Sequence, residues 1–245
     1  MNGSLLLQTQ KIGVSFGGVH AVKEVDFNLF AGELRCLIGP NGAGKSTFFK
    51  MLSGQVSPTR GQCLYRGKVI SGMRPWEIAR LGIGIKTQVP SVFEGLSVWD
   101  NLWQAAAIRL EKRAIAAAID EVLQDIGLTA VKNAILSELA HGQRQWVELG
   151  MILISRPQLV LLDEPAAGMT HHEVRKTAEL IKAINQQSTV VVVEHDMEFI
   201  SMIAQQVTVF NQGAVLAEGT FAEVTAQQSV KDAYLGNMEI KHAAN

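Results

Sequence analysis

The sequence predicts an α/β fold with a mostly parallel sheet, because three short apolar runs each lead directly into polar residues. The runs cover residues 34–38, 159–162 and 189–193 and consist largely of leucine, isoleucine and valine. Unbroken apolar runs of this length are typical of strands that are covered on both faces, as in parallel sheets. Ligands bind beyond the carboxyl ends of such strands. We therefore expect the residues that follow the three runs to share one site.

The composition is that of an ordinary folded protein with one large domain. The chain has 245 residues, of which 47% are hydrophobic and 18% charged, and its formal net charge is −1. This length is sufficient for a sizeable core, and the near-zero charge provides no overall basic field for nucleic acid. Only two cysteines, Cys36 and Cys63, are present, which argues against a disulfide framework or a zinc site. Neither a signal-peptide pattern nor a membrane-spanning apolar run is found, so we expect no membrane span.

The middle of the chain, residues 90–156, is predicted to be helical because it is rich in alanine and has no strand pattern. Four apolar residues recur there at spacings of four, three and four, as on one face of a helix. They are Ile115, Ile119, Val122 and Ile126. Gly127 is suited to end that helix. The simplest layout inserts this helical subdomain into an α/β core made of residues 1–89 and 157–245.

The last part of the chain is predicted to form a β-hairpin and a closing helix. The apolar pattern of residues 207–219 is interrupted by a turn sequence at residues 211–213, which is typical of a hairpin. The closing helix is expected over residues 221–235.

A phosphate-binding loop follows the first apolar run, since residues 39–47 match the pattern G-x-x-x-x-G-K-[ST]. They are Gly39, Pro40, Asn41, Gly42, Ala43, Gly44, Lys45, Ser46 and Thr47. A predicted strand precedes the motif and a predicted helix follows it, which is the context the motif requires. Backbone amides and the helix N-terminus would face a phosphate. Lys45 would then reach the β- and γ-phosphates of ATP, and the Ser46 hydroxyl would bind Mg²⁺.

Polar side chains also follow the other two runs. Asp163 is the natural carboxylate on the magnesium side, and Glu164 could orient or deprotonate the attacking water. His195 leaves the same edge and could contact the γ-phosphate. Adjacent acids can also be a solvated strand end, and a lone histidine is often a surface or core residue. The phosphate-binding loop favours the catalytic interpretation, because such a loop requires an acid nearby.

Two further motifs complete an ordered set that resembles the ATP-binding subunit of ABC transporters over essentially the whole chain. One contains Gln88, and the other is the stretch 139–143, which precedes Asp163. The resemblance implies an ABC-type P-loop NTPase core, an N-terminal antiparallel β portion, and the cofactors ATP and Mg²⁺. It further implies that Gln88 links magnesium and water to the transporter contact, and that Phe16 stacks on adenine. Phe16 could otherwise be a core aromatic.

The stretch before Asp163 departs from the family's usual signature, Leu-Ser-Gly-Gly-Gln. In the family, this signature closes over the ATP that a second subunit holds. The corresponding residues here are Ala140, His141, Gly142 and Gln143. Ala140 cannot supply the serine hydroxyl, and a hydrogen bond to a charged group contributes ~1.5–3 kcal/mol. The site completed by this subunit could therefore bind ATP more weakly, unless His141 replaces the missing contact.

Several segments look like the UrtD-type subunit of bacterial urea importers, and branched-chain amino-acid importer ATPases share much of this pattern. Both families imply a second ATPase or a homodimer, two membrane permeases and, indirectly, a periplasmic binding protein, at the cytoplasmic face of the inner membrane. Nucleic acid is not an expected partner. The alternative is a soluble ABC-type switch in translation or DNA repair. The single nucleotide-binding unit and the lack of a basic linker or long coiled-coil insert argue against it.

Two residue pairs have competing interpretations. Adjacent histidines on a helix point to different faces, so His171 and His172 are expected at a solvated helix start rather than at a metal. Trp99 and Trp103, four residues apart, could pack locally or form part of a partner-facing patch together with the segment after Gln88.

Overall fold

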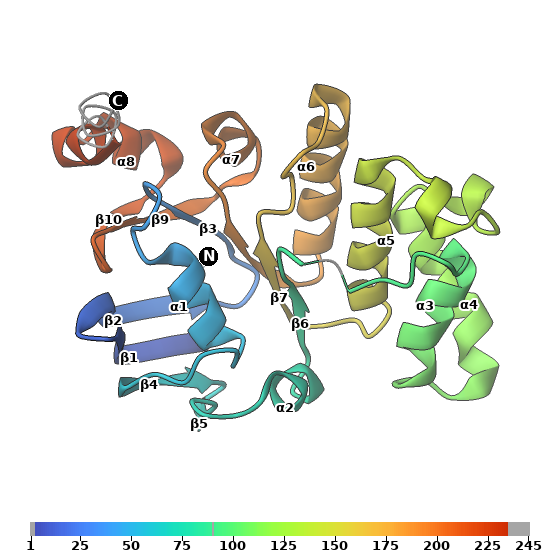
Figure 1. Ribbon diagram of the computed structural model, residues 1–245, viewed down its shortest axis with the longest axis horizontal. Helices are drawn as coiled ribbons and strands as arrows, with labels where there is room; N and C mark the ends of the chain where they lie inside the picture. Colours follow the sequence, from blue (N-terminus) through green and yellow to red (C-terminus); the bar gives the residue numbers. More distant parts are fainter. Residues whose placement is uncertain (1–2, 90, 235–245) are drawn as a thin grey trace.

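The computed structural model describes residues 3–89 and 91–234, which form two sheets with helices packed around them (Figure 1). The first sheet is antiparallel and has the order β2-β1-β4-β5. Its strands are β1 (Leu5–Phe16), β2 (Val19–Phe30), β4 (Arg60–Tyr65) and β5 (Lys68–Val69). The implied N-terminal antiparallel portion is thereby confirmed.

The second sheet has the order β10-β9-β3-β8-β7-β6 and is parallel except at the β9–β10 pair. Its strands are β3 (Leu34–Ile38), β6 (Ile83–Lys86), β7 (Leu159–Asp163), β8 (Thr189–Val193), β9 (Gln206–Asn211) and β10 (Ala214–Gly219). All three apolar runs form strands, and the hairpin near the end of the chain is present. No pattern in the sequence predicts β6, the edge strand that leads to Gln88.

Eight helices have both ends within the described part of the chain. They are α1 (Lys45–Leu52), α2 (Pro75–Arg80), α3 (Val98–Ala107), α4 (Lys112–Asp125), α5 (His141–Leu153), α6 (His171–Asn185), α7 (Met197–Ile203) and α8 (Phe221–Ala226). The regular structure within residues 91–156 consists of α3, α4, α5 and two 3₁₀ turns, Thr129–Val131 and Leu136–Glu138. The one strand-like pairing in this range is the isolated bridge between Ser97 and Ile135. Pro90, at the expected boundary, lies outside the described residues.

The expected closing helix over residues 221–235 is not continuous. α8 ends at Ala226, because Gln227 has an extended backbone with φ −70° and ψ 131°. Helical conformation resumes over residues 228–234. Position 235 lies outside the described residues.

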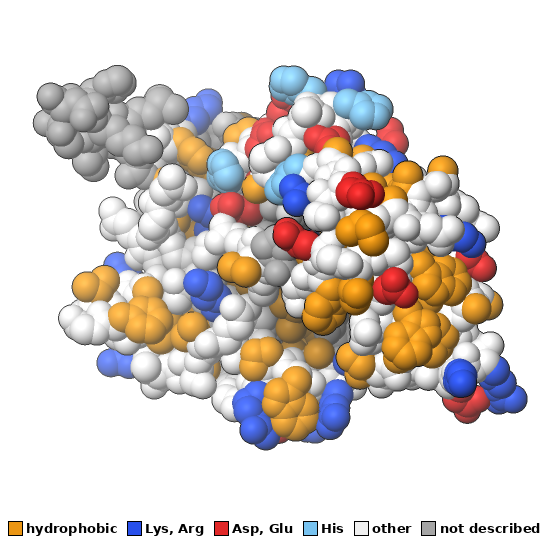
Figure 2. All heavy atoms as spheres, turned by 45° about the vertical axis from the view of Figure 1, so that its right-hand side comes forward, with side chains coloured by type: hydrophobic (Ala, Val, Ile, Leu, Met, Phe, Trp, Pro, Cys, Tyr) orange, Lys and Arg blue, Asp and Glu red, His pale blue; other side chains and the backbone are white. Residues whose placement is uncertain are grey.

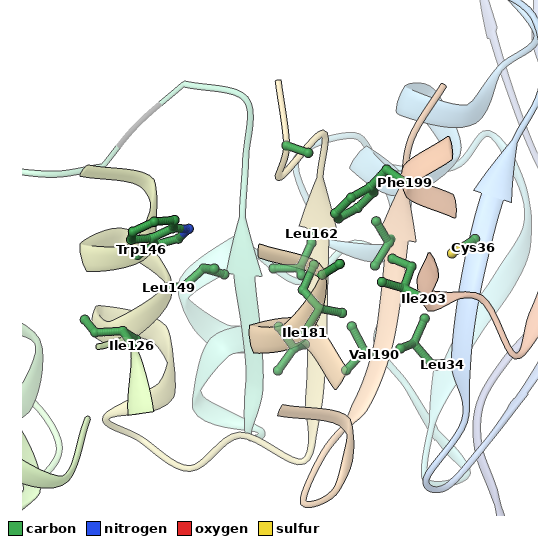
Figure 3. Close-up of a cluster of buried hydrophobic side chains, with 14 of the residues drawn as sticks. Leu34, Cys36, Ile126, Trp146, Leu149, Leu162, Ile181, Val190, Phe199 and Ile203 are labelled. Atoms are coloured by element: carbon green, nitrogen blue, oxygen red, sulfur yellow. The ribbon is translucent and has the colours of Figure 1, made fainter. Parts of the chain in front are cut away.

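The six-stranded sheet separates two hydrophobic clusters, because successive side chains of a strand point to opposite faces. Val190 of β8, labelled in Figure 3, and Val192 belong to the cluster on the α5–α7 side, whereas Val191 and Val193 face the antiparallel sheet and α1. The predicted apolar stripe of α4 is buried in the first of these clusters. Gly127 follows it with φ 66°, as expected of a residue that ends a helix.

No helix in residues 3–89 and 91–234 is long and apolar enough to cross a bilayer.

Candidate functional site

A cavity of about 570 Å³ opens where the β3–α1 loop meets the start of β2 and the β9–β10 turn. This volume lies within the range of small-molecule sites. The lining includes Glu164 and seven residues of the predicted loop, namely Asn41, Gly42, Ala43, Gly44, Lys45, Ser46 and Thr47. The loop and one of the predicted catalytic acids therefore face the same space.

Two glycines allow the loop to fold tightly against its neighbours. Gly39 has φ 145°, and a β-carbon there would lie 2.2 Å from the carbonyl oxygen of Phe210. Gly44 has φ 100°, and its β-carbon would lie 2.6 Å from the carbonyl oxygen of Ala21. Gly44 immediately precedes α1. The unpaired amides of the first helical turn are thus available to an anion.

The Lys45 ammonium is held inside the loop that carries it. Its Nζ donates hydrogen bonds to the carbonyl oxygens of Gly39, at 2.6 Å, and Pro40, at 3.0 Å. Burial lowers the pKa of Lys45, and the negative charges of Glu164 and Asp163 oppose that shift. The two acids thus favour the charged form of Lys45, which is the form that can bind phosphate.

Asp163 ends β7 with its side chain 3% exposed, and its Oδ1 is buried without a hydrogen-bond partner. Burial, and next the charge of Glu164, raise its pKa to about 6. An unpaired buried carboxylate oxygen fits a hard cation such as Mg²⁺. The described residues contain no group of three or more His, Cys, Asp or Glu side chains that could hold a metal. Such a cation would thus need additional ligands from phosphate and water.

Gln88, Glu164 and His195 meet although they are far apart in the sequence. Gln88 Nε2 donates to Glu164 Oε2 at 2.8 Å, and His195 Nδ1 lies 3.4 Å from Glu164 Oε1. The three residues follow β6, β7 and β8, which are neighbours in the sheet. Glu164 has φ 48°, a backbone conformation that is costly for a non-glycine residue and clusters at functional sites.

Glu194 is a functional candidate that sequence reasoning missed. Its carboxylate is 2% exposed and accepts hydrogen bonds from the backbone amides of Ala166, at 3.2 Å, and His195, at 3.0 Å. Burial raises its pKa, whereas these amides lower it. Glu194 thereby fixes the chain after β7 to the chain after β8, and its bond to Ala166 joins residues 28 positions apart, which no local pattern signals.

The residues Ala140, His141, Gly142 and Gln143 form the start of α5 and do not line the cavity of Lys45. The Gly142 amide donates to Glu173 Oε1 at 3.0 Å, and His141 Nε2 lies 3.1 Å from the carbonyl oxygen of Ala167. Gln143 Oε1 accepts from the Ala140 amide. Within one chain, this helix start and the predicted phosphate-binding loop therefore do not share the cavity.

Comparison with known proteins decides the family. The ABC transporter family model matches residues 22–167. The chain belongs to the ABC transporter family. LivG of Escherichia coli K12, named as a high-affinity branched-chain amino acid transport ATP-binding protein, is 34% identical to this ABC chain, over 94% of it and 98% of LivG. BraF of Pseudomonas aeruginosa, with the same description, is 31% identical over the same shares.

Solved ABC structures have the same fold. An ATP-binding cassette in its ADP conformation superposes with a TM-score of 0.86, covering 95% of this chain and 99% of that one at 24% identity. cbiO1 from Clostridium perfringens, part of the cbiONQ complex, superposes with a TM-score of 0.83 at 27% identity and covers 98% of both chains. The family match and the curated relatives identify this ABC subunit as an ATP-hydrolysing transport ATPase.

Phe16 does not line the nucleotide cavity of this ABC subunit, although it lies at the adjoining β1–β2 turn and is exposed. Six residues that sequence reasoning missed do line it. They are Val19, His20, Ala21, Lys23, Gln212 and Gly213. The Gly213 amide donates to the carbonyl oxygen of Ala43 at 2.9 Å, so the β9–β10 turn supports the phosphate-binding loop.

Exposed hydrophobic side chains gather on the side that carries the helical segment of this ABC subunit (Figure 2). Val89 is 77% exposed and Ile108 80%, and Phe93 and Trp103 are also exposed. Trp99 instead packs against the core, so the two tryptophans have different roles. His171 and His172 are exposed at the start of α6, as expected.

Proposed function

We propose that this ATPase is one half of a dimer whose closure over ATP drives a membrane permease. The observation that carries the proposal is the separation of its two half-sites. Gln88, Glu164 and His195 meet beside the phosphate-binding loop, whereas the residues from Ala140 to Gln143 do not line the cavity of that loop. A second subunit that supplied its own signature helix would complete each ATP site.

In this proposal, Lys45 and the amides of residues 39–47 hold the β- and γ-phosphates. The donor set of Ser46, Gln88 and Asp163 is suited to Mg²⁺, which supplies charge neutralisation at the phosphates. Glu164 takes a proton from water as the water oxygen bonds to the γ-phosphorus and the bond to the β–γ bridging oxygen breaks. Gln88 and His195, which already contact Glu164, orient that water and the γ-phosphate.

ATP then binds the closed dimer more tightly than the open one, since only the closed dimer contacts it from both sides. Hydrolysis removes the γ-phosphate contacts and releases the closed state. The helical stretch over residues 90–156 works as a subdomain inserted between the core halves 1–89 and 157–245. Its exposed apolar residues, among them Phe93, are suited to receive a permease helix together with the exposed Val89, which directly follows Gln88.

We infer that the transported molecule is urea, with a branched-chain amino acid as the second candidate. The sequence motifs that look like the UrtD type support urea. The names of LivG and BraF, at 34% and 31% identity, support the amino acid. Either importer would comprise a second ATPase or a homodimer, two permeases and a periplasmic binding protein. This chain would lie at the cytoplasmic face of the bacterial inner membrane.

Uptake in the native host tests both the need for ATP hydrolysis and the assigned substrate. Cells that lack the gene are complemented with the wild type, Lys45→Ala or Glu164→Gln, and uptake of labelled urea and labelled leucine is measured at low concentration. We expect the wild type to restore uptake of the labelled substrate, and we expect neither variant to restore it. If only leucine uptake is restored, the urea assignment is wrong. If neither label depends on the gene, both assigned substrates are wrong.

Fractionation separates the transporter from the soluble alternative. The ATPase is expected to sediment with membranes through its permeases. Sedimentation with ribosomes would contradict the transporter proposal.

A further inference from the structure

Lys86, the last residue of β6, and Glu148, in α5, form an ion pair that is almost completely buried. Their side chains are 2% and 5% exposed, and Lys86 Nζ lies 3.3 Å from Glu148 Oε2. Removing two charges from water is unfavourable, and apolar residues of similar volume are often at least as stable in such positions. Stability alone therefore does not account for the pair, which points to a positional role.

The same carboxylate also holds the other end of the loop that carries Gln88. The backbone amide of Ser91 donates to Glu148 Oε1 at 2.9 Å. One carboxylate thus binds the chain at Lys86, two residues before Gln88, and at Ser91, three residues after it. Between these two points, Gln88 Nε2 reaches Glu164 at 2.8 Å.

α5 packs directly on β6, so Glu148 is held in a fixed position relative to the loop that carries Gln88. A β-carbon at Gly84 of β6 would lie 2.3 Å from Cγ2 of Ile152 in α5, and only glycine allows this approach. The first turn of the same helix contains His141, Gly142 and Gln143. Glu148 therefore lies on the helix that begins at the signature and also binds both ends of the Gln88 loop.

We propose that Lys86 and Glu148 are positioning residues that set Gln88 against Glu164 and join the Gln88 loop to the signature helix. The inference rests on the proposed function, because it assigns the pair to the hydrolysis that Glu164 performs. Displacement of the loop by a permease would be passed through Glu148 to α5. Neither residue lines the nucleotide cavity. Loss of the pair should therefore lower kcat for ATP and leave KM nearly unchanged.

ATP hydrolysis by the transporter, purified through a tag on this chain, tests the proposal. Glu148→Gln keeps the side-chain shape and the oxygen that accepts from Ser91, but removes the charge that pairs with Lys86. We expect kcat to fall at least about tenfold, since misplacing a group by about 1 Å can cost ~100-fold. KM for ATP should stay within about twofold. An unchanged kcat, or a rise in KM that accounts for the loss, overturns the proposal.

A double variant separates positioning from stability. Lys86→Met/Glu148→Leu removes both charges and the Ser91 acceptor, and should melt at or above the wild-type temperature because the buried pair is replaced by apolar groups. Its kcat should nevertheless remain low. A stable double variant with wild-type kcat overturns the proposal. If the double variant does not fold, the kcat and KM of Glu148→Gln alone test the positioning role.

Glu33→Gln is the matched control. Glu33 Oε1 lies 2.5 Å from Arg35 Nε, and its Oε2 accepts from the Phe30 amide at 3.1 Å, so it also joins a cation to a backbone amide. Glu33 does not contact the Gln88 loop. The kcat of the Glu33→Gln variant should therefore equal that of the wild type. An equal loss in both variants overturns the positioning role. If the wild type itself does not hydrolyse ATP, the proposed function fails instead.

Discussion

The backbone amide of Gly142 donates a 3.0 Å hydrogen bond to the carboxylate of Glu173 in the same chain. This amide belongs to the helix start that, in the proposed dimer, meets the phosphate of ATP held by the partner. Gly142 has no β-carbon, and one built there would lie 2.4 Å from Glu173 Oε1. The amides of Thr170 and Gly142, among other contacts, lower the pKa of Glu173. An ionised carboxylate therefore already occupies an anion-binding position.

Glu173→Gln should strengthen ATP-dependent association of the subunit, because it removes a negative charge that opposes phosphate at the start of α5. The change is made in a Glu164→Gln background that slows hydrolysis. We expect the ATP concentration for half-maximal association, measured by light scattering, to fall several-fold, in line with ~1 kcal/mol for one charge at a helix end.

Glu223→Gln is the control for that experiment. Glu223 makes the same capping contacts with Thr220 that Glu173 makes with Thr170, but at the start of α8. It should weaken its helix in the same way without changing association. Equal effects of the two variants would show that Glu173 acts only as a helix cap.

Ala140→Ser should also tighten ATP-dependent association. Serine at this position can donate a hydroxyl to a phosphate oxygen and can cap α5, whose first residue has no side-chain cap in the wild type. A charged hydrogen bond contributes ~1.5–3 kcal/mol, so the association constant should rise about tenfold or more. Unchanged nucleotide affinity and turnover would indicate that another group, such as His141, already supplies the contact.

Asp163→Asn should stabilise the nucleotide-free protein at neutral pH. The pKa of Asp163 in the folded protein is about 6, above its ordinary value of 3.8, so the folded state holds this proton more tightly than the unfolded chain. Folding stability therefore falls as pH rises from about 4 to 6 and stays lower above that range. The difference is at most ~3 kcal/mol.

Thermal melts of the wild type and Asp163→Asn measure this effect. The variant should melt higher at pH 7.5, and the gap should close near pH 4. ATP hydrolysis should be lost in the variant. A difference in melting temperature that is independent of pH would contradict the titration of Asp163. The control is Asp120→Asn, a change at an exposed site.

Both cysteines should be unreactive in the folded protein. Cys36 and Cys63 are free and buried, and burial raises the pKa of Cys63 to about 12 and that of Cys36 further. Because the thiolate is the reactive form, a thiol reagent at pH 8 should label them only as the chain opens. ATP should slow labelling, since a ligand that binds the folded state stabilises it. Rapid labelling without unfolding would contradict this burial.

The three strands that lead toward Lys45, Glu164 and His195 could be predicted because each is a largely apolar run followed by functional residues. The edge strand β6 could not, since it has only four residues, including a glycine, and ends in a lysine. The predicted closing helix was wrong in its continuity, because no local signal marked the break at Gln227.

The sequence by itself determined the family, the parallel core and the residues that form the phosphate-binding loop, because these depend on local motifs and short apolar runs. The tertiary structure decided which side chains meet. The Gln88–Glu164 contact joins residues 76 positions apart, and the Glu148–Ser91 contact joins residues 57 apart. Such contacts depend on strand order and helix packing, so the spacing of residues along the chain does not specify them. The same packing brings Glu173 to Gly142, a contact that the signature motif alone does not suggest.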